Sequence, residues 1–444
     1  MLTKTVKNNQ SSMFLTLVDM LNPNHPLFIL SNTINWKIFE DSFSVFYCKD
    51  NGRPSKPIRL MVGLLILKHL RNVSDETIVE QWSENIYYQY FCGKNEFVPI
   101  VPCEASELVH FRKRIGEAGV ELILKESIRV NGKDGEEENA SIDSTVQEKN
   151  ITYPTDNKLH RKIINRCKKI SQKENLQVRQ SYTYVLKKLS VDQRFRNHPK
   201  NKCKALRADK KVKTIAGRFV REIERNLNQN EYYKTDIELF KQILNQKKTD
   251  KNKIYSIHKP EVECISKGKE HKKYEFGNKV SIVYTQSTGV IIGAKGFRNP
   301  YDGHTIESAL EQVERIRPSK KLKTLIGDRG YRGKTQINGV EIKIPKPFNK
   351  SKMCKYQQIK SRKQFKRRAA IEPIIGHLKT DYRLGRNFYK GIFGDNINIM
   401  LATAAFNFKK MMNKWKSSFC LFFEKFIYYF CNQFFCAKNF KWGF

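Results

Sequence analysis

Two aspartates stand in strand-like segments where a carboxylate could bind a metal ion. Asp328 ends the apolar run that starts at Leu325, and a glycine-containing turn over residues 329–331 follows it. Asp143 lies in the alternating, β-branched segment 140–146. A buried carboxylate is costly unless something positive binds it. Both aspartates are therefore metal-ligand candidates, and the alternative for Asp328 is a residue that only opens a turn.

Glu372 lies in a later helical segment and is flanked by cations. At about 100° per residue, Arg368, Glu372 and Lys379 fall within about 60° of one helix face. Phe365 falls in the same sector. Pro373 either kinks this helix or is its first residue, in which case the shared face begins at Glu372. A surface helix with ordinary salt bridges is the alternative.

If Glu372 joins Asp143 and Asp328, three carboxylates converge, and the flanking Arg and Lys can hold a phosphate backbone against them. Such a set suits two divalent ions, one that activates a water or a 3′-hydroxyl and one that stabilises the leaving oxygen. Oxygen ligands without a cysteine or histidine cluster favour Mg²⁺ or Mn²⁺ over zinc.

Helical patterns precede the first of these aspartates. One helix is predicted over residues 56–72, and Ser74 can cap a second helix. A third helix is predicted to begin near Ser106, and it carries the basic residues His110, Arg112, Lys113 and Arg114. Three short helices of which the last is basic suit a helix-turn-helix DNA-binding unit. A plain helical bundle with a solvated basic face remains the alternative.

The aspartates are predicted to belong to a mixed α/β sheet. The expected order is strand, helical insertion, two strands in a hairpin, helix, two strands and a final helical region. The insertion, 157–253, is strongly basic, which favours phosphate contact over a solvated face. The predicted domains are an N-terminal helical domain (1–130), a catalytic domain (138–156 and 254–410), the insertion and an aromatic-rich tail (411–444).

The balance of charge points to a polyanionic partner. The chain of 444 residues has 83 Lys and Arg against 44 Asp and Glu, a net charge of +39. So large an excess is typical of nucleic-acid binding, and a membrane surface is the rival partner.

The cysteines and the hydropathy favour a cytoplasmic, nucleoid-associated protein. The ten cysteines are scattered without a Cys-x-x-Cys pair, which argues against a zinc module and a disulfide framework. The sequence shows no signal peptide pattern and no long uncharged apolar run. The aromatic tail is expected to dock on the protein itself or on a second subunit.

Seven motifs in order along the chain carry a resemblance to a known family. They are Ile142-Asp-Ser-Thr, Asn150-Ile-Thr-Tyr-Pro-Thr-Asp, Ser256-Ile-His-Lys-Pro-Glu-Val-Glu, His271-Lys-Lys-Tyr-Glu-Phe-Gly, Gly303-His, Asp328-Arg-Gly-Tyr-Arg-Gly and Arg368-x3-Glu-x6-Lys. Over residues 50–410 the chain resembles the DDE transposases of bacterial insertion sequences, of the insertion-sequence-five type.

The resemblance implies a ribonuclease-H-like catalytic domain in which Asp143, Asp328 and Glu372 bind the metal ions. It also implies that Arg368 and Lys379 belong to a Tyr-Arg-Glu-Lys signature that contacts DNA near the cleaved phosphate. This chain has Phe365 where the signature has tyrosine, so one hydroxyl contact with DNA is missing.

Residues beside Asp328 have two interpretations. Arg329 and Tyr331 either contact DNA or brace the turn. His304 either caps the following helix or takes part in catalysis.

The resulting hypothesis is a transposase that binds the terminal inverted repeats of its element as a homo-oligomer on double-stranded DNA. It would nick the ends and join their 3′-hydroxyls to target DNA. The rivals are a metal-dependent nuclease without a joining step and a non-catalytic DNA-binding relic or repressor.

Overall fold

A computed structural model describes residues 16–48, 51–227, 230–247, 249–266, 272–345 and 354–436. Within these ranges it does not describe the side chains of residues 360, 361, 364 and 418–436. His271 of the fourth motif and most of the aromatic tail therefore lie outside the described residues. The chain forms two compact units, Met1–Gln147 with Lys279–Phe444, and Glu148–Asn278.

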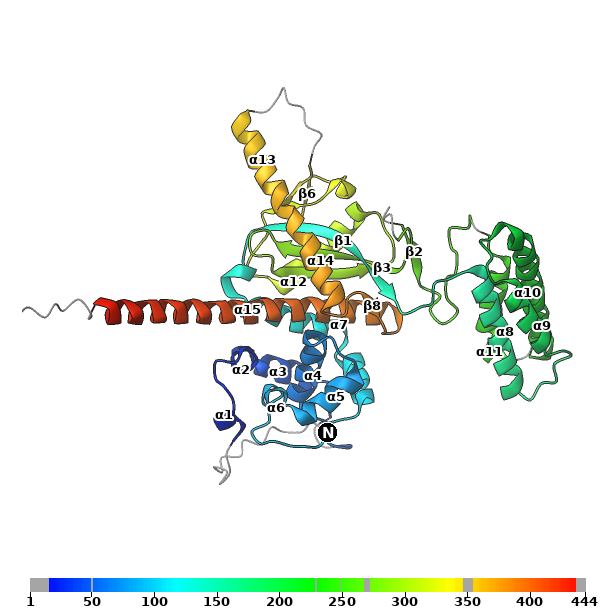
Figure 1. The fold of residues 1–444 in the computed structure, drawn as a ribbon, viewed down its shortest axis with the longest axis horizontal. Helices are drawn as coiled ribbons and strands as arrows, with labels where there is room; N and C mark the ends of the chain where they lie inside the picture. Colours follow the sequence, from blue (N-terminus) through cyan, green and yellow to red (C-terminus); the bar gives the residue numbers. More distant parts are fainter. Residues whose placement is uncertain are drawn as a thin grey trace, which may run out of the picture. The chain divides into compact units, whose positions relative to one another are not determined.

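Seven helices begin the first unit (Figure 1). They are α1 (Leu17–Met20), α2 (Pro26–Thr33), α3 (Trp36–Ser44), α4 (Ile58–Leu70), α5 (Asp75–Glu84), α6 (Ile86–Phe91) and α7 (Ala105–Val130). The three helices expected between residues 56 and 114 correspond to α4, α5 and α7. Ser74 caps α5 as predicted, because its hydroxyl accepts a hydrogen bond from Thr77 N at 3.1 Å.

The sheet of the first unit is mixed, as predicted. Its strands are β1 (Asn139–Lys149), β3 (Glu275–Thr285), β4 (Ile291–Phe297), β5 (Thr324–Ile326), β6 (Gln336–Ile337), β7 (Val340–Lys343) and β8 (Arg386–Asn387). They lie in the order β3-β1-β5-β7-β6, with β4 paired to β3 and β8 paired to β1. β1, β5 and β7 run parallel, whereas β3 and β4 form the expected antiparallel hairpin.

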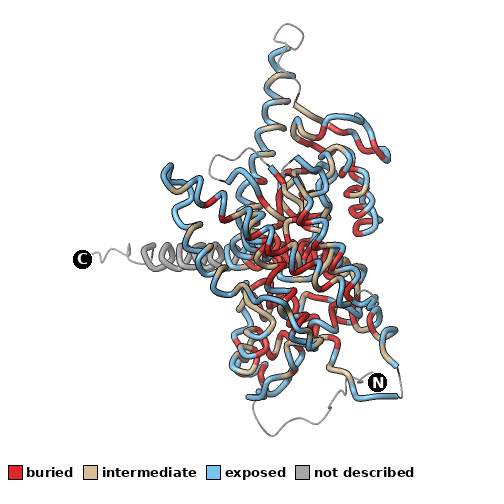
Figure 2. Tube along the Cα trace, turned by 90° about the vertical axis from the view of Figure 1, so that its right-hand side faces the viewer, coloured by how far each residue is buried: buried red, intermediate tan, exposed pale blue. Residues whose placement is uncertain are grey.

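The N-terminal helices and the sheet share one hydrophobic core, which Figure 2 shows as buried segments. Helix α15 (Gly391–Cys436) packs against α4 and α7 as well as β4. Its buried Asn407 accepts from Ile291 N at 2.9 Å and donates to Ser127 Oγ at 3.1 Å. A helix from far along the chain thus joins the described N-terminal helices to the sheet within one compact unit.

A buried histidine in α4 predicts how stability depends on pH. His69 is fully buried between Leu65 O and Asn398 Oδ1, and burial, together with the charge of Lys68, lowers its pKa from 6.5 to about 3. Below pH 6.5 the His69 imidazole therefore becomes protonated in the unfolded chain but stays neutral in the folded chain. Urea unfolding should show about 2 kcal/mol of stability lost between about pH 6.5 and 5 through this residue.

The matched variants are His69→Gln, which should flatten that pH dependence, and His110→Gln, at an exposed histidine, which should leave it unchanged. An equal slope in the His69→Gln protein would show that this imidazole is not kept neutral.

The second unit is helical, as the basic insertion was expected to be. Its helices are α8 (Asp156–Lys173), α9 (Thr183–Asp192), α10 (Pro199–Asn226) and α11 (Glu231–Asn245). They have a core of their own that includes Ile163, Phe219 and Phe240. A short strand, β2 (Glu263–Ile265), pairs antiparallel with the first residues of β3.

Among the residues that the structure describes, no helix combines the length and the apolar character that crossing a membrane requires. Trp415, at the start of the aromatic tail, packs partly buried against the core of the first unit.

Candidate active site

The register of two parallel strands places Asp143 and Asp328 at the same level. Ser141 of β1 lies opposite Ile326 of β5, and each aspartate follows two residues after its paired neighbour. Asp143 remains within β1, and its side chain is 20% exposed. Asp328 follows the end of β5 and caps the 3₁₀ turn η3 (Arg329–Tyr331), because its Oδ1 accepts from Gly330 N at 2.8 Å. Asp328 thus does open a turn, and it does so at the edge where Asp143 lies.

A third aspartate, Asp302, lies beside Asp328. It begins the 3₁₀ turn η2 (Asp302–Thr305). A methyl group added at Gly330 would lie 2.9 Å from Asp328 Oδ1 and 3.2 Å from Asp302 Oδ2. Lys279 Nζ lies 3.3 Å from Asp302 Oδ1. Sequence reasoning did not single out Asp302, although it directly precedes the Gly303-His304 motif.

Tyr331 is the last residue of the η3 turn that Asp328 caps, and its side chain is buried. Tyr331 is 1% exposed. Burial raises its pKa well above the usual value, and the negative charges of Asp302, Asp143 and Asp328 raise it further. The negative charges of three carboxylates from separate segments of the chain thus act on one buried hydroxyl.

The burial of Tyr331 corrects its predicted contact with DNA. Of the two roles considered, the structure shows the bracing one, since the ring packs in the core beneath the η3 turn. Gly327 fits closely against this ring, because a Cβ there would lie 3.1 Å from Tyr331 Cβ. Arg329 is exposed and remains available to DNA.

Tyr331→Phe distinguishes these roles. The hydroxyl has no hydrogen-bond partner among the described residues, and the neighbouring Ser281 donates to Thr305 Oγ1 instead. Removing the hydroxyl should therefore change the free energy of unfolding by less than about 1 kcal/mol and leave DNA affinity unchanged in a fluorescence anisotropy titration. Tyr331→Ala is the contrasting variant, and loss of the ring should cost about 3–5 kcal/mol. A clear loss of DNA affinity in the stably folded Phe variant would favour direct contact.

Arg112, a predicted DNA contact in α7, is also buried. It is 4% exposed, and its two terminal nitrogens donate to the two carboxylate oxygens of Asp75, each at 2.7 Å. It therefore holds α7 against α5 and presents no surface to DNA. Arg114, the other contact predicted in this helix, is exposed and lies 4.5 Å over the ring of Tyr47.

A helical segment brings a cation to Asp143. Helix α13 (Lys355–Arg367), the 3₁₀ turn η4 (Arg368–Ala370) and helix α14 (Ile371–Thr380) follow one another directly. Arg368 Nη1 lies 3.1 Å from Asp143 Oδ2, and the Arg368 carbonyl accepts from Tyr284 Oη at 3.0 Å. Both contacts fix the η4 turn against the sheet.

Pro373 accounts for the 3₁₀ turn. A proline at this position cannot donate to the carbonyl of Ala369, and its ring crowds that carbonyl, which disfavours an uninterrupted α-helix there. Glu372 lies inside α14 and does not cap it. The sequence left two alternatives, a kink at Pro373 or Pro373 as the first residue of the helix. The structure instead has a short 3₁₀ turn before α14.

Glu372 is exposed, one turn beyond Arg368 on the same helix face. Lys379, near the end of α14, is half-buried. Within the described parts of the chain, no three Asp, Glu, His or Cys side chains lie close enough to hold a metal ion. The structure thus sets Asp143 level with Asp328, Asp302 beside Asp328 and Arg368 on Asp143. Among the described residues it does not assemble a metal site from these aspartates and Glu372.

The donor atoms at this site are those that hard divalent cations prefer. The side chains offer carboxylate oxygens, which bind Mg²⁺ and Mn²⁺. Asp302 Oδ1 is buried and accepts no hydrogen bond from the described residues, so one carboxylate oxygen has capacity for a cation beyond the Lys279 ammonium group. The carboxylates of Asp143, Asp302 and Asp328 are thus of the chemical kind that binds Mg²⁺ or Mn²⁺, although among the described residues they do not lie close enough together to form a metal site.

Comparisons with known proteins show the family of the chain. Residues 15–114 match a family model described as Transposase domain (DUF772), and residues 248–408 match one described as Transposase DDE domain. A protein of Rhizobium meliloti, described as uncharacterized protein ORF8 in the nfe locus, is 39% identical over 184 residues. The match covers 40% of this chain and 88% of that protein. No solved structure matches the chain. The chain belongs to the transposases that carry a DDE domain.

Proposed function

We propose that this transposase binds the terminal inverted repeats of an insertion sequence, cleaves DNA at their ends and joins the new 3′-hydroxyls to target DNA. The observation that carries the proposal is the strand register that sets Asp143 level with Asp328, with Arg368 in contact with Asp143. Carboxylates at such a position can hold the metal ions that phosphoryl transfer uses, and a guanidinium beside them can stabilise the charge that develops on the phosphate. The insertion-sequence-five type and the ribonuclease-H-like fold are part of this proposal.

Asp143, Asp328 and Glu372 are proposed to hold the metal ions, and Asp302 is close enough to Asp328 to support them. A Mg²⁺ or Mn²⁺ pair supplies activation of the attacking oxygen and stabilisation of the leaving oxygen. For Glu372 to join the aspartates, the exposed face of α14 must turn toward β1. Arg368, which already lies there, would then be released to bind the scissile phosphate in place of Asp143.

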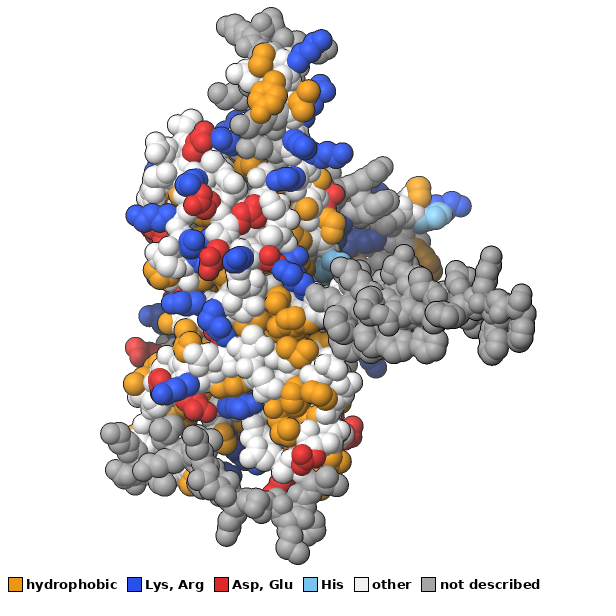
Figure 3. Space-filling view, turned by 90° about the vertical axis from the view of Figure 1, so that its left-hand side faces the viewer, with side chains coloured by type: hydrophobic (Ala, Val, Ile, Leu, Met, Phe, Trp, Pro, Cys, Tyr) orange, Lys and Arg blue, Asp and Glu red, His pale blue; other side chains and the backbone are white. Residues whose placement is uncertain are grey.

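The side chains that we propose to contact DNA are those predicted contacts that the structure leaves exposed or half-buried. Arg329 beside Asp328, Lys379 of α14 and Arg114 of α7 keep their predicted roles, with His110 and Lys113 exposed on the same helix as Arg114. Basic and acidic side chains are interspersed on the face of the first unit that Figure 3 shows. Binding of the inverted repeats by α4, α5 and α7 and assembly of a homo-oligomer on paired ends complete the proposal.

A joining assay tests the proposed function. Pre-cut duplexes with free 3′-hydroxyls, taken from the DNA ends that flank this reading frame, are incubated with a supercoiled plasmid and Mg²⁺. We expect joined products in which the duplex is covalently attached to nicked or linear plasmid. Cleavage of uncut ends without any joined product would instead identify a metal-dependent nuclease, and end binding without either reaction would identify a repressor.

A further inference from the structure

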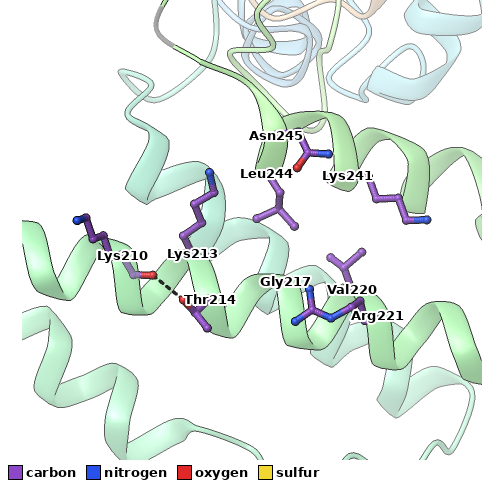
Figure 4. A pocket seen from close by; sticks show the side chains of 9 residues that line it. All are labelled: Lys210, Lys213, Thr214, Gly217, Val220, Arg221, Lys241, Leu244 and Asn245. Atoms are coloured by element: carbon purple, nitrogen blue, oxygen red, sulfur yellow. Dashed lines mark hydrogen bonds between the residues drawn. The ribbon is translucent and has the colours of Figure 1, made fainter.

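A hollow lined by basic side chains lies in the second unit, between α10 and α11 (Figure 4). Its volume is about 600 Å³. Four cations line it: Lys210, Lys213, Arg221 and Lys241. Two uncharged polar residues and two apolar ones line it as well, Thr214, Asn245, Val220 and Leu244, and no acidic residue does. We call this hollow the α10–α11 cleft.

The sequence places these cations on one side of a helix. Lys210, Lys213 and Arg221 recur at intervals of three and eight residues in α10, which brings them to one face. The opposite face carries Val212, Phe219 and other residues of the second unit's core. Because like charges at this spacing repel, clustering them lowers the stability of the helix unless an anion binds there.

Three of the four cations of the cleft form no ion pair with the residues that the structure describes. Among the residues that the structure describes, no carboxylate forms an ion pair with Lys210, Lys213 or Arg221, and all three are exposed. Lys241 pairs with Glu224, at the border of the cleft. In the same helix Lys204, which does not line the cleft, has such a partner, since it pairs with Asp192 at 3.1 Å.

Gly217 keeps the cleft open between the cations. A Cβ there would lie 3.3 Å from Arg221 Nη1, so Arg221 lies close along the helix. In Figure 4, Lys213 rises from α10 on one side of this gap, and Leu244 and Asn245 reach toward it from α11. The floor is apolar and the rim carries donors only on charged or amide groups. A concave site of this kind suits an anion with several oxygens better than a solvated convex helix face does.

We propose that the α10–α11 cleft binds the phosphate backbone of duplex DNA, at a site separate from the carboxylates around Tyr331. The ammonium groups of Lys210 and Lys213 and the guanidinium of Arg221 contact phosphate oxygens, and the Asn245 amide adds a neutral donor. Such contacts do not depend on the base sequence. The cleft would therefore increase the affinity for any duplex and help to orient the protein on it. The proposal rests on the proposed function only in naming DNA as the polyanion.

The test measures how salt weakens DNA binding by the full chain. A 30-base-pair duplex of random sequence is titrated in EDTA at several salt concentrations, by fluorescence anisotropy, so that neither the metal site nor the element's ends are needed. Lys213→Glu/Arg221→Glu removes two cleft cations. Lys202→Glu/Lys211→Glu is the matched control, because these lysines are exposed on the same helix and do not line the cleft.

The cleft variant should bind at least about tenfold more weakly at low salt, and its plot of log K against log salt should be shallower by about 2. The control variant should keep a slope within about 0.5 of the wild-type value. Circular dichroism checks that each variant is folded. If the glutamate variant of the cleft is not folded, Lys213→Gln/Arg221→Gln replaces it, and we expect this variant also to bind more weakly and to give a shallower slope.

A cleft variant with the wild-type slope, or a control variant with an equal loss, would overturn the proposal. The outcome is separate from that of the joining assay. If the wild type joins no DNA but the cleft variant shows the predicted change of slope, the cleft proposal stands and the proposed function fails. If the wild type joins DNA but the slope does not change, the proposed function stands and the cleft proposal fails.

Discussion

Replacing Asp143 with alanine is expected to lower metal-dependent nicking of DNA by at least about 10³-fold. Asp143 is set level with Asp328 by the parallel pairing of β1 and β5, so its loss removes one of the two carboxylates that the strands themselves bring together. Stability should change little, because the Asp143–Arg368 ion pair is partly exposed, at 20% and 29%. DNA affinity should be retained, since the exposed cations are unaltered.

The measurement is a nicking assay in Mg²⁺ on supercoiled DNA that carries the element's ends, with an anisotropy titration beside it. Glu341→Ala is the matched control, because Glu341 is an exposed carboxylate on β7 of the same sheet and should leave nicking unchanged. Equal nicking by the wild type and the Asp143→Ala protein would show that the reaction does not use this carboxylate.

The largest effect on stability is expected from Asp75→Ala. The Asp75 carboxylate pairs with Lys68 Nζ at 2.9 Å and with Arg112 at 2.7 Å, and the side chains of these two cations are only 3% and 5% exposed. Both cations also lie over the ring of Tyr389, at 4.7 and 4.5 Å. Removing the carboxylate leaves two buried positive charges without their counter-ion, which should cost about 3–5 kcal/mol.

Urea unfolding at pH 7 measures this loss, and Glu76→Ala, at an exposed carboxylate of the same helical turn, should change the free energy of unfolding by less than about 0.5 kcal/mol. The stability that this network contributes also depends on pH. Burial raises the pKa of Asp75, but the hydrogen bonds from Arg112 and the charge of Lys68 outweigh it, so the pKa falls from 3.8 to about 2.

Because the folded-state pKa is depressed, the stability that Asp75 contributes is complete above pH 3.8 and is lost as the pH falls toward 2. Acid unfolding of Asp75→Asn should lack that component. If Asp75→Ala unfolds at the same urea concentration as the wild type, Arg112 is not held by this network and its predicted role at DNA regains support.

The sequence was sufficient to find the two strand aspartates. Alternation over 140–146 and the apolar run before Asp328 are local patterns, and pleated strands produce such patterns directly. The cap at Ser74 and the β3–β4 hairpin were predictable for the same reason, since both depend on residues close together in the chain.

Contacts between distant residues were not predictable in this way. In the sequence, Arg112 is one of several cations on a basic helix. Only the structure shows that it pairs with Asp75 of another helix. Tyr331 follows a turn that could face solvent, yet its ring enters the core. Asp302 gains significance only from its distance to Asp328, which no spacing in the sequence reveals. The shared core of the N-terminal helices and the sheet depends likewise on α15.

Binding of Mn²⁺ to the complex of the full chain with element-end DNA, followed by electron paramagnetic resonance, tests most directly whether the three acids act together. Glu372 is exposed, so Glu372→Ala should fold normally and any loss of metal can be assigned to the carboxylate. We expect each of Asp143→Ala, Asp328→Ala and Glu372→Ala to weaken Mn²⁺ binding at least about tenfold. Mn²⁺ binding by Glu372→Ala that equals the wild type would contradict the meeting of three carboxylates around one metal site.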